Sequence, residues 1–290
     1  MTKEKFIKRF FLFFALLSIF FLAGILFVLF KEGISAFGKI NLGGFLFGRS
    51  WYPTHTPGEF GILPLILGSL LVTVGALVVA VPLGIGSAIY ISEVAKPGVR
   101  DVIKPLLEIL AGIPSVVYGF FGMVVFAPFI QRIFDIPTGL TAFTASVILG
   151  IMALPTIASI AEDAISSVPK SYKEASLSLG ATEWETIARV TVPSAMSGIS
   201  AAIILGMGRA IGETMTVLMV AGGAAVIPHT FFQPVRTMTA TIAAEMGETM
   251  VGGIHYQSLF AIAIVLFLLT LTFNIIADHI SHRYKKKMTG

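Results

Sequence analysis

The stretch ILPLILGSLLVTVGALVVAVPLGIGSAIYI, residues 62–91, contains no charged side chain and determines the class of fold. The hydrocarbon core of a bilayer is about 30 Å thick, and a helix needs about 20 apolar residues to cross it. Lipid offers no hydrogen bonds to the backbone, so a membrane-crossing stretch of this kind is expected to be helical. We therefore predict a transmembrane helix over residues 62–91 that accommodates Pro64 and Pro82.

Five further stretches have the same character. The chain of 290 residues is 56% hydrophobic and 12% charged, which is too apolar for a soluble domain. The other predicted transmembrane helices cover residues 10–30, 105–129, 140–161, 195–226 and 258–277. The predicted fold class is therefore an all-α membrane protein with about six transmembrane helices.

The predicted spans divide the chain into three parts. Residues 1–61 would form an N-terminal anchor helix and an outer loop, residues 62–279 the core domain, and residues 280–290 a basic tail. The first apolar run follows four basic residues, as in a signal peptide. That run is too long for a signal peptide and lacks a cleavage site of small residues, so we expect it to be retained as an anchor.

The basic residues are distributed unevenly between the two sides of the predicted bundle. Residues 1–9, 92–104, 162–194 and 280–290 would share one side and carry fourteen of the twenty Lys and Arg residues, whereas the opposite side carries five. By the positive-inside rule, both termini are expected in the cytoplasm of an inner-membrane protein. The net charge of +4 reflects this loop bias and gives no reason to expect nucleic acid as a partner.

The loop at residues 162–194 has the pattern of two short helices around a glycine. Gly180 is suited to the left-handed conformation that ends a helix. Thr182 and Glu185 have the spacing of a capping box, and Pro193 is expected to close the second helix. These features alone leave two alternatives open, an amphipathic hairpin without a partner or a knob that docks on another protein.

Two charged residues lie in the middle of the predicted span 195–226. An arginine at mid-membrane costs about 2.5–3.5 kcal/mol on insertion scales, so Arg209 needs an explanation. Glu213 follows four residues later, and on a continuous helix the two side chains would share a face and form an ion pair. Gly208 and Gly212 are predicted to let another helix pack closely. The pair either locks helix packing or places Arg209 beside the path of an anion.

Two motifs give the chain a family resemblance. Glu174-Ala175-Ser176, Gly180 and Val190-Thr191-Val192-Pro193 have the spacing of the EAA motif of ABC-importer permeases, with Ser176, Val190 and Val192 as mild departures. Together with the stretch GRAIGETM at residues 208–215, this motif makes the chain resemble the permease subunits of ABC-type phosphate importers. The resemblance implies the type I ABC importer permease fold.

The resemblance also implies roles and partners. Arg209, Glu213 and Thr214 are expected in the substrate pathway, and Glu174, Ala175, Gly180, Val190 and Pro193 at the contact with an ATPase. The implied partners are a homologous second permease subunit, two ATPase subunits, an extracytoplasmic phosphate-binding protein, phosphate and the lipid bilayer. ATP and magnesium would be bound by the ATPase, and no cofactor or metal by this chain, which is expected to be a transporter subunit and not an enzyme.

Alternatives from other classes remain open. A permease of the same superfamily could carry molybdate or sulfate. A membrane enzyme acting on lipid would need a nucleophile and base or metal ligands, and the absence of cysteine excludes thiolate chemistry. A membrane scaffold or sensor without transport activity is the third alternative.

Overall fold

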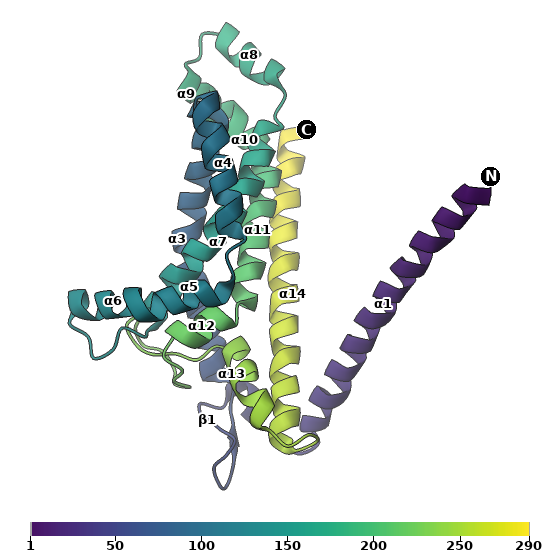
Figure 1. Ribbon diagram of the computed structural model, residues 1–290, viewed down its shortest axis with the longest axis vertical. Coiled ribbons are helices and arrows are strands. Elements are labelled where there is room, and N and C mark those ends of the chain that lie inside the picture. The colour runs from purple at the N-terminus through teal and green to yellow at the C-terminus, as the bar shows by residue number, and fades with distance from the viewer. Residues whose placement is uncertain (1, 290) are drawn as a thin grey trace.

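The computed structural model describes the backbone of residues 2–289 and the side chains of residues 4–279 (Figure 1). The longer α-helices are α1 (Thr2–Ala36), α3 (Leu63–Ile89), α4 (Pro97–Ala111), α7 (Ala142–Ser166), α11 (Met196–Gly212) and α14 (Ile254–Thr289). The shorter ones are α2 (Leu42–Phe47), α5 (Ser115–Phe121), α6 (Ala127–Phe134), α8 (Lys170–Ser178), α9 (Glu183–Thr186), α10 (Val192–Ser194), α12 (Met215–Val220) and α13 (Met238–Glu245). Wider or tighter helical turns are η1 (Tyr90–Val94), η2 (Gly122–Phe126), η3 (Ile187–Thr191) and η4 (Met246–Glu248), and β1 (Trp51–Tyr52) pairs antiparallel with β2 (Glu59–Phe60).

The centre of the fold is the packing of α7 against α3 on one side and α11 on the other. Small residues line these contacts. A Cβ at Gly150 would lie 2.9 Å from the side chain of Val79, and one at Gly206 would lie 2.5 Å from Ile157. Ala153 is fully buried between the same helices. Small side chains at helix crossings let apolar helices approach closely, which is how helices associate where lipid provides no hydrophobic driving force.

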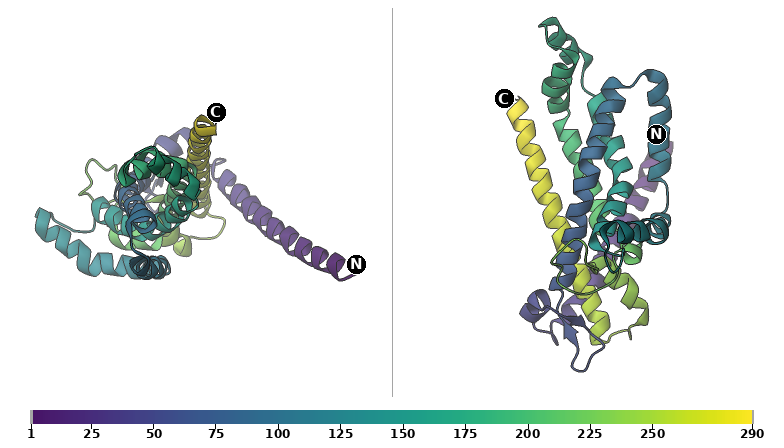
Figure 2. Two further views of the ribbon diagram at one scale, coloured as in Figure 1. Left: turned by 90° about the horizontal axis from the view of Figure 1, so that it is seen from above. Right: turned by 90° about the vertical axis from the view of Figure 1, so that its left-hand side faces the viewer.

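The first helix has little contact with the rest of the chain. Figures 1 and 2 show α1 projecting away from the bundle, with only its C-terminal end beside α14. There, Gly33 packs on Ile264, and the rings of Phe30 and Phe267 meet edge to face at 6.3 Å. The apolar window of α1 has no buried residue, so this helix is covered by lipid or by another chain.

The ends of the helices form two groups. The N-terminus, the turn from η1 into α4, the hairpin of α8 and α9, and the C-terminal end of α14 lie at one end of the molecule (Figure 1). The β1–β2 hairpin and the N-terminal end of α14 lie at the other end. The four basic segments are therefore grouped together, as the sequence predicts, although the side chains of residues 280–290 lie outside the described part.

The predicted span 105–129 is wrong as a single helix. The chain leaves α4 at Ala111, turns at Gly112–Pro114, and continues as α5, η2 and α6 almost at right angles to α3 and α7 (Figure 1). Proline lacks a backbone N–H, and it also disfavours helical geometry in the residue before it. Residues Ser115–Phe134 are long and apolar enough to cross a membrane, but they lie across the bundle axis.

The predicted span 195–226 is also wrong as a single helix. A bend of 67° at Ala195 separates α11 from α10, and α11 ends at Gly212. Glu213 has extended geometry, with ψ 130°, and α12 starts two residues later. Among the described residues, five helices could span a membrane by length and composition, or six if the bent pair counts as one span.

Candidate functional site

The hairpin of α8 and α9 forms through short-range contacts. Gly180 has a φ of 87°, which is the left-handed geometry predicted for it. The Thr182 hydroxyl accepts the Glu185 N–H at 3.3 Å, and the Glu185 carboxylate accepts the Thr182 N–H at 3.0 Å, so the predicted capping box is confirmed. Pro193 lies in the last helical segment before the bend, because α10 ends at Ser194.

The tip of this hairpin is exposed and partly apolar. Glu174, Ala175 and Gly180 are exposed, and Val190 and Pro193 are half-buried at its base. The side chains of Leu179 and Trp184 are 90% and 67% exposed. Large apolar side chains on a projecting tip are typical of a surface that binds another protein.

An ion pair that the sequence analysis missed attaches the hairpin to the bundle. The Lys173 ammonium lies 2.6 Å from the carboxylate of Glu93 in η1, whose side chain is only 8% exposed. The Ser176 and Thr186 hydroxyls are 2.9 Å apart across the two arms. The hairpin is therefore joined to the end of α3 and not only to the helices beside it in the chain.

A second ionic cluster ties α4 to α7 near the same end. The buried carboxylate of Glu162 accepts from Arg100 at 2.5 Å and from Lys104 at 2.6 Å, and Lys104 also binds Asp163 at 2.8 Å. Hydrogen bonds to Asp163 and Glu162 raise the pKa of Lys104, which therefore stays charged at physiological pH. The cluster holds α4 upright beside α7 before the chain turns into α5.

Arg209 lies near the end of α11 and is half-buried. One terminal guanidinium nitrogen donates to the Thr156 hydroxyl at 2.9 Å, and the other approaches the carbonyl of Ala111 at 3.5 Å. The predicted ion pair with Glu213 is wrong, since no carboxylate of the described residues pairs with Arg209. The physical reason is the end of α11 at Gly212, which removes the helical spacing that would align the two side chains.

Glu213 instead stabilises the break that follows α11. Its carboxylate accepts the Thr216 N–H at 3.0 Å in the first turn of α12, and its carbonyl accepts the Thr239 hydroxyl at 2.8 Å. Thr214 donates to the carbonyl of Gly212 at 3.2 Å. Backbone in apolar surroundings needs such partners, because water is not available to provide them.

The two helix breaks face each other. The Thr216 hydroxyl in α12 donates to the carbonyl of Ser115, the first residue of α5, at 2.9 Å. Arg209 reaches from α11 toward Ala111, the last residue of α4. Interrupted helices that meet inside an apolar bundle are the usual setting of substrate sites in transporters, where backbone groups and helix ends face the solute.

The glycine prediction is met only in part. No other part of the described chain lies within 4 Å of where a Cβ would stand at Gly208 or Gly212. Within this chain the close helix contact is made at Gly206, one turn earlier, against Ile157. Packing of Gly208 and Gly212 on a helix of a second chain stays a prediction.

A bundle of apolar helices with interrupted segments and a projecting hairpin defines a membrane transport subunit. Residues 80–286 match the model of the family described as binding-protein-dependent transport system inner membrane component, and the chain belongs to this family. It is therefore a multi-pass permease subunit of an ABC transporter and not an enzyme.

The chain is similar to several named permeases. It is 41% identical over 241 residues to the probable ABC transporter permease protein YqgH of Bacillus subtilis strain 168, which covers 83% of this chain and 78% of the relative. It is 36% identical over 291 residues to the phosphate transport system permease protein PstC of Mesorhizobium japonicum, with 93% and 87% covered. The PstC protein of Haemophilus influenzae is also 36% identical, with 89% and 86% covered.

The fold matches that of solved importer permeases. A chain of a bacterial ABC transporter involved in the import of the acidic polysaccharide alginate superimposes with a TM-score of 0.67, 20% sequence identity, and 98% and 99% of the two chains covered. A chain of the MetNI methionine ABC transporter gives a TM-score of 0.58, with 20% identity and 77% and 94% covered. The predicted type I importer permease fold is thereby confirmed.

Proposed function

We propose that this chain is a permease subunit of an ATP-driven phosphate importer and that Arg209 contacts the anion. The names of the PstC relatives, at 33–36% identity over most of the chain, support phosphate as the substrate. The observation that carries the proposal is a half-buried guanidinium, at two facing helix breaks, that no carboxylate of the described residues neutralises. An anion passing there would supply the missing charge.

The chemistry of arginine suits an oxyanion. A guanidinium presents several N–H donors in one plane and can hold two oxygens of a phosphate at once. Thr156 uses one terminal nitrogen of Arg209, whereas the 3.5 Å contact with the Ala111 carbonyl is long enough to yield to a better acceptor. Glu213 would compete for Arg209 only after leaving the Thr216 N–H, so this competition belongs to a later step of the cycle.

The hairpin of α8 and α9 is the proposed contact with the ATPase subunits. Its exposed residues include Glu174, Ala175 and Gly180 of the motif, and Leu179 and Trp184 at the tip. In the proposed assembly, two ATPase subunits bind ATP and magnesium and move the hairpin. A homologous permease completes the pathway, and an extracytoplasmic binding protein delivers phosphate.

This assembly fixes the proposed orientation. A hairpin that meets a cytoplasmic ATPase lies on the cytoplasmic side of the cell inner membrane. The N- and C-terminal ends of the chain lie at the same end as the hairpin, so both would be cytoplasmic (Figure 1). The excess of basic residues in these segments agrees with that orientation.

The test is uptake of labelled oxyanions by proteoliposomes that contain the complex co-purified with its neighbours. ATP-dependent phosphate uptake, with weak competition from sulfate and molybdate, is the expected result. Uptake of molybdate or sulfate in preference to phosphate would replace the substrate and keep the transport class. A complex that transports none of them would contradict the proposal.

A further inference from the structure

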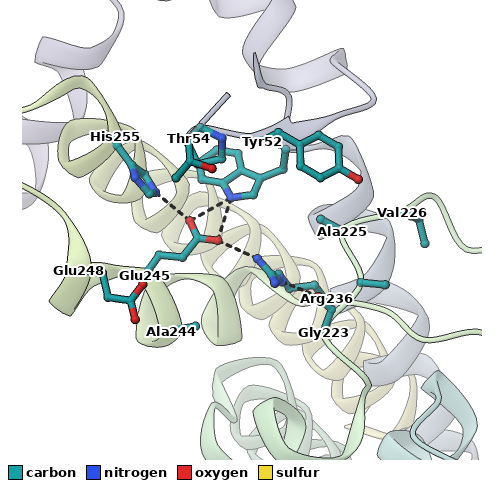
Figure 3. Close-up of a pocket in the computed structure, with 13 residues that line it drawn as sticks. Tyr52, Thr54, Gly223, Ala225, Val226, Arg236, Ala244, Glu245, Glu248 and His255 are labelled. Carbon is teal, nitrogen blue, oxygen red and sulfur yellow. Dashed lines mark hydrogen bonds and ion pairs between the residues drawn. The ribbon is translucent and has the colours of Figure 1, made fainter. Parts of the chain in front are cut away.

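A carboxylate at the end opposite the hairpin collects donors from three separate segments. Glu245, the last residue of α13, accepts the Trp51 indole N–H at 3.0 and 3.2 Å from its two oxygens. One oxygen lies 2.7 Å from a terminal nitrogen of Arg236, and the other lies 2.8 Å from the His255 ring. Figure 3 shows the three side chains converging on Glu245 from the β hairpin, the strand-like segment before α13, and α14. We call these four residues the Glu245 cluster.

The cluster is shielded on one side and open on the other. Trp51 is only 2% exposed, which corrects the expectation that this aromatic lies at the lipid headgroups. The Glu245 side chain is 16% exposed and borders a cavity of about 590 Å³ (Figure 3). Hydrogen bonds to a charged group are stronger than neutral ones, so the cluster holds firmly while the cavity leaves room for its members to move.

Helix α13 connects this cluster to the candidate substrate site. Its second residue, Thr239, donates to the carbonyl of Glu213, and its first residue, Met238, donates its N–H to the Ser69 hydroxyl at 2.9 Å. An eight-residue helix is about 12 Å long, so α13 spans the distance from the break after α11 to the Glu245 cluster. In Figure 1, α13 lies between α12 and the end of the molecule that carries the β hairpin.

The chain around α13 permits movement. Gly223, whose carbonyl accepts the Arg236 Nε–H at 2.8 Å, has a φ of 71°, and Gly252 beyond the helix has a φ of 78°. No other part of the described chain lies within 4 Å of a Cβ placed at either glycine. Arg236 therefore ties both the Gly223 segment and the end of α13 into one unit that depends on Glu245.

We infer that Glu245 is a positioning residue that latches α13 over the outer side of the Arg209 and Glu213 region. With the Glu245 cluster intact, α13 holds the Glu213 carbonyl and covers the break. Release of the cluster frees the C-terminal end of α13, and access from outside to the break opens. The inference rests on the proposed function, because it takes that break as the place that the anion reaches.

The test uses the absence of cysteine from the chain. A single Met215→Cys replacement places a thiol at the start of α12, where Met215 is 40% exposed, directly after the break. The assembled complex in proteoliposomes, oriented so that the β hairpin faces the added solution, is treated with a membrane-impermeant thiol reagent without phosphate. The measured quantity is the rate of labelling.

Glu245→Gln is expected to raise the labelling rate about ten-fold, the effect of losing one charged hydrogen bond on a two-state equilibrium. Glu248→Gln is the matched control, because Glu248 lines the same cavity three residues away and is exposed without a hydrogen bond to any described residue. Trp51→Phe removes one donor and keeps the ring, so its labelling rate is expected between the two. Equal rates for Glu245→Gln and Glu248→Gln would overturn the inference.

Two further results separate the latch from neighbouring explanations. If Glu245→Gln fails to assemble, Trp51→Phe decides, and a labelling rate equal to that of the parent would contradict the latch. The labelling needs no phosphate, so it does not depend on the substrate. If Arg209→Gln kept full uptake, the proposed function would fail while a labelling difference at Met215→Cys would stand.

Discussion

The hairpin at residues 170–194 and the facing helix breaks near Arg209 are held by contacts of different range. The hairpin depends on Thr182 and Glu185, three positions apart, and on Ser176 and Thr186, ten positions apart. At the breaks, Thr239 bonds Glu213 from 26 positions away, and Thr216 bonds Ser115 from 101. A part built from local contacts can work as a rigid handle, whereas a part held by distant contacts changes when the helices move.

The largest expected effect separates docking from folding at the hairpin. Leu179→Asp places a charge on a side chain that is 90% exposed, so the free energy of unfolding of this chain should change little. Combined with Trp184→Ala, it should weaken ATPase binding about a hundred-fold, as the loss of interface anchors does. Co-purification of the ATPase, with thermal unfolding of the permease as the control, measures both quantities. Unchanged co-purification would exclude the tip as the contact.

The next effect concerns the distant contacts of Arg209. Thr156→Val removes the hydroxyl that accepts from the guanidinium at 2.9 Å and keeps a similar shape. A hydrogen bond to a charged group contributes about 1.5–3 kcal/mol, so phosphate uptake should fall at least about ten-fold. Thr156→Ser is the matched control and should retain most of the uptake. If Val and Ser at this position gave equal uptake, Thr156 would have no part in positioning Arg209.

The smallest effect tests how local the hairpin is. Thr182→Ala removes the cap of α9, a change that costs about 1 kcal/mol in helices of this kind. Uptake should fall by no more than about five-fold, because η3 and the Lys173–Glu93 ion pair still hold the hairpin. Hydrogen exchange should show faster opening confined to residues 180–191. Faster exchange spreading into α7 and α11 would show that the hairpin is not an independent unit.

The sequence carries the local half of this comparison. The capping box, the left-handed Gly180 and the apolar content of the spans follow from nearest-neighbour chemistry, and the structure confirms each of them. Gly112 and Pro114 also signalled a break, but an apolar window that averages about 20 residues passes over them. The turn after Ala111 was therefore visible in principle and was missed for that reason.

The distant half could not be predicted from spacing. Arg209 and Glu213 share a face only if α11 continues, and whether it continues is decided by Thr216 and Thr239, which bind Glu213. The same holds for the Glu245 cluster, whose members come from positions 9 to 194 residues away. A single sequence contains these residues but gives no sign that they meet.

The most direct measurement records phosphate uptake and ATP hydrolysis in the same proteoliposomes for Arg209→Gln and for Arg132→Gln. Arg132 is the control, because it is an exposed arginine on α6. The expected result for Arg209→Gln is uptake reduced about a hundred-fold, as for the loss of two charged hydrogen bonds to the anion, with assembly and basal ATP hydrolysis retained. Phosphate uptake by Arg209→Gln equal to that of Arg132→Gln would contradict the account.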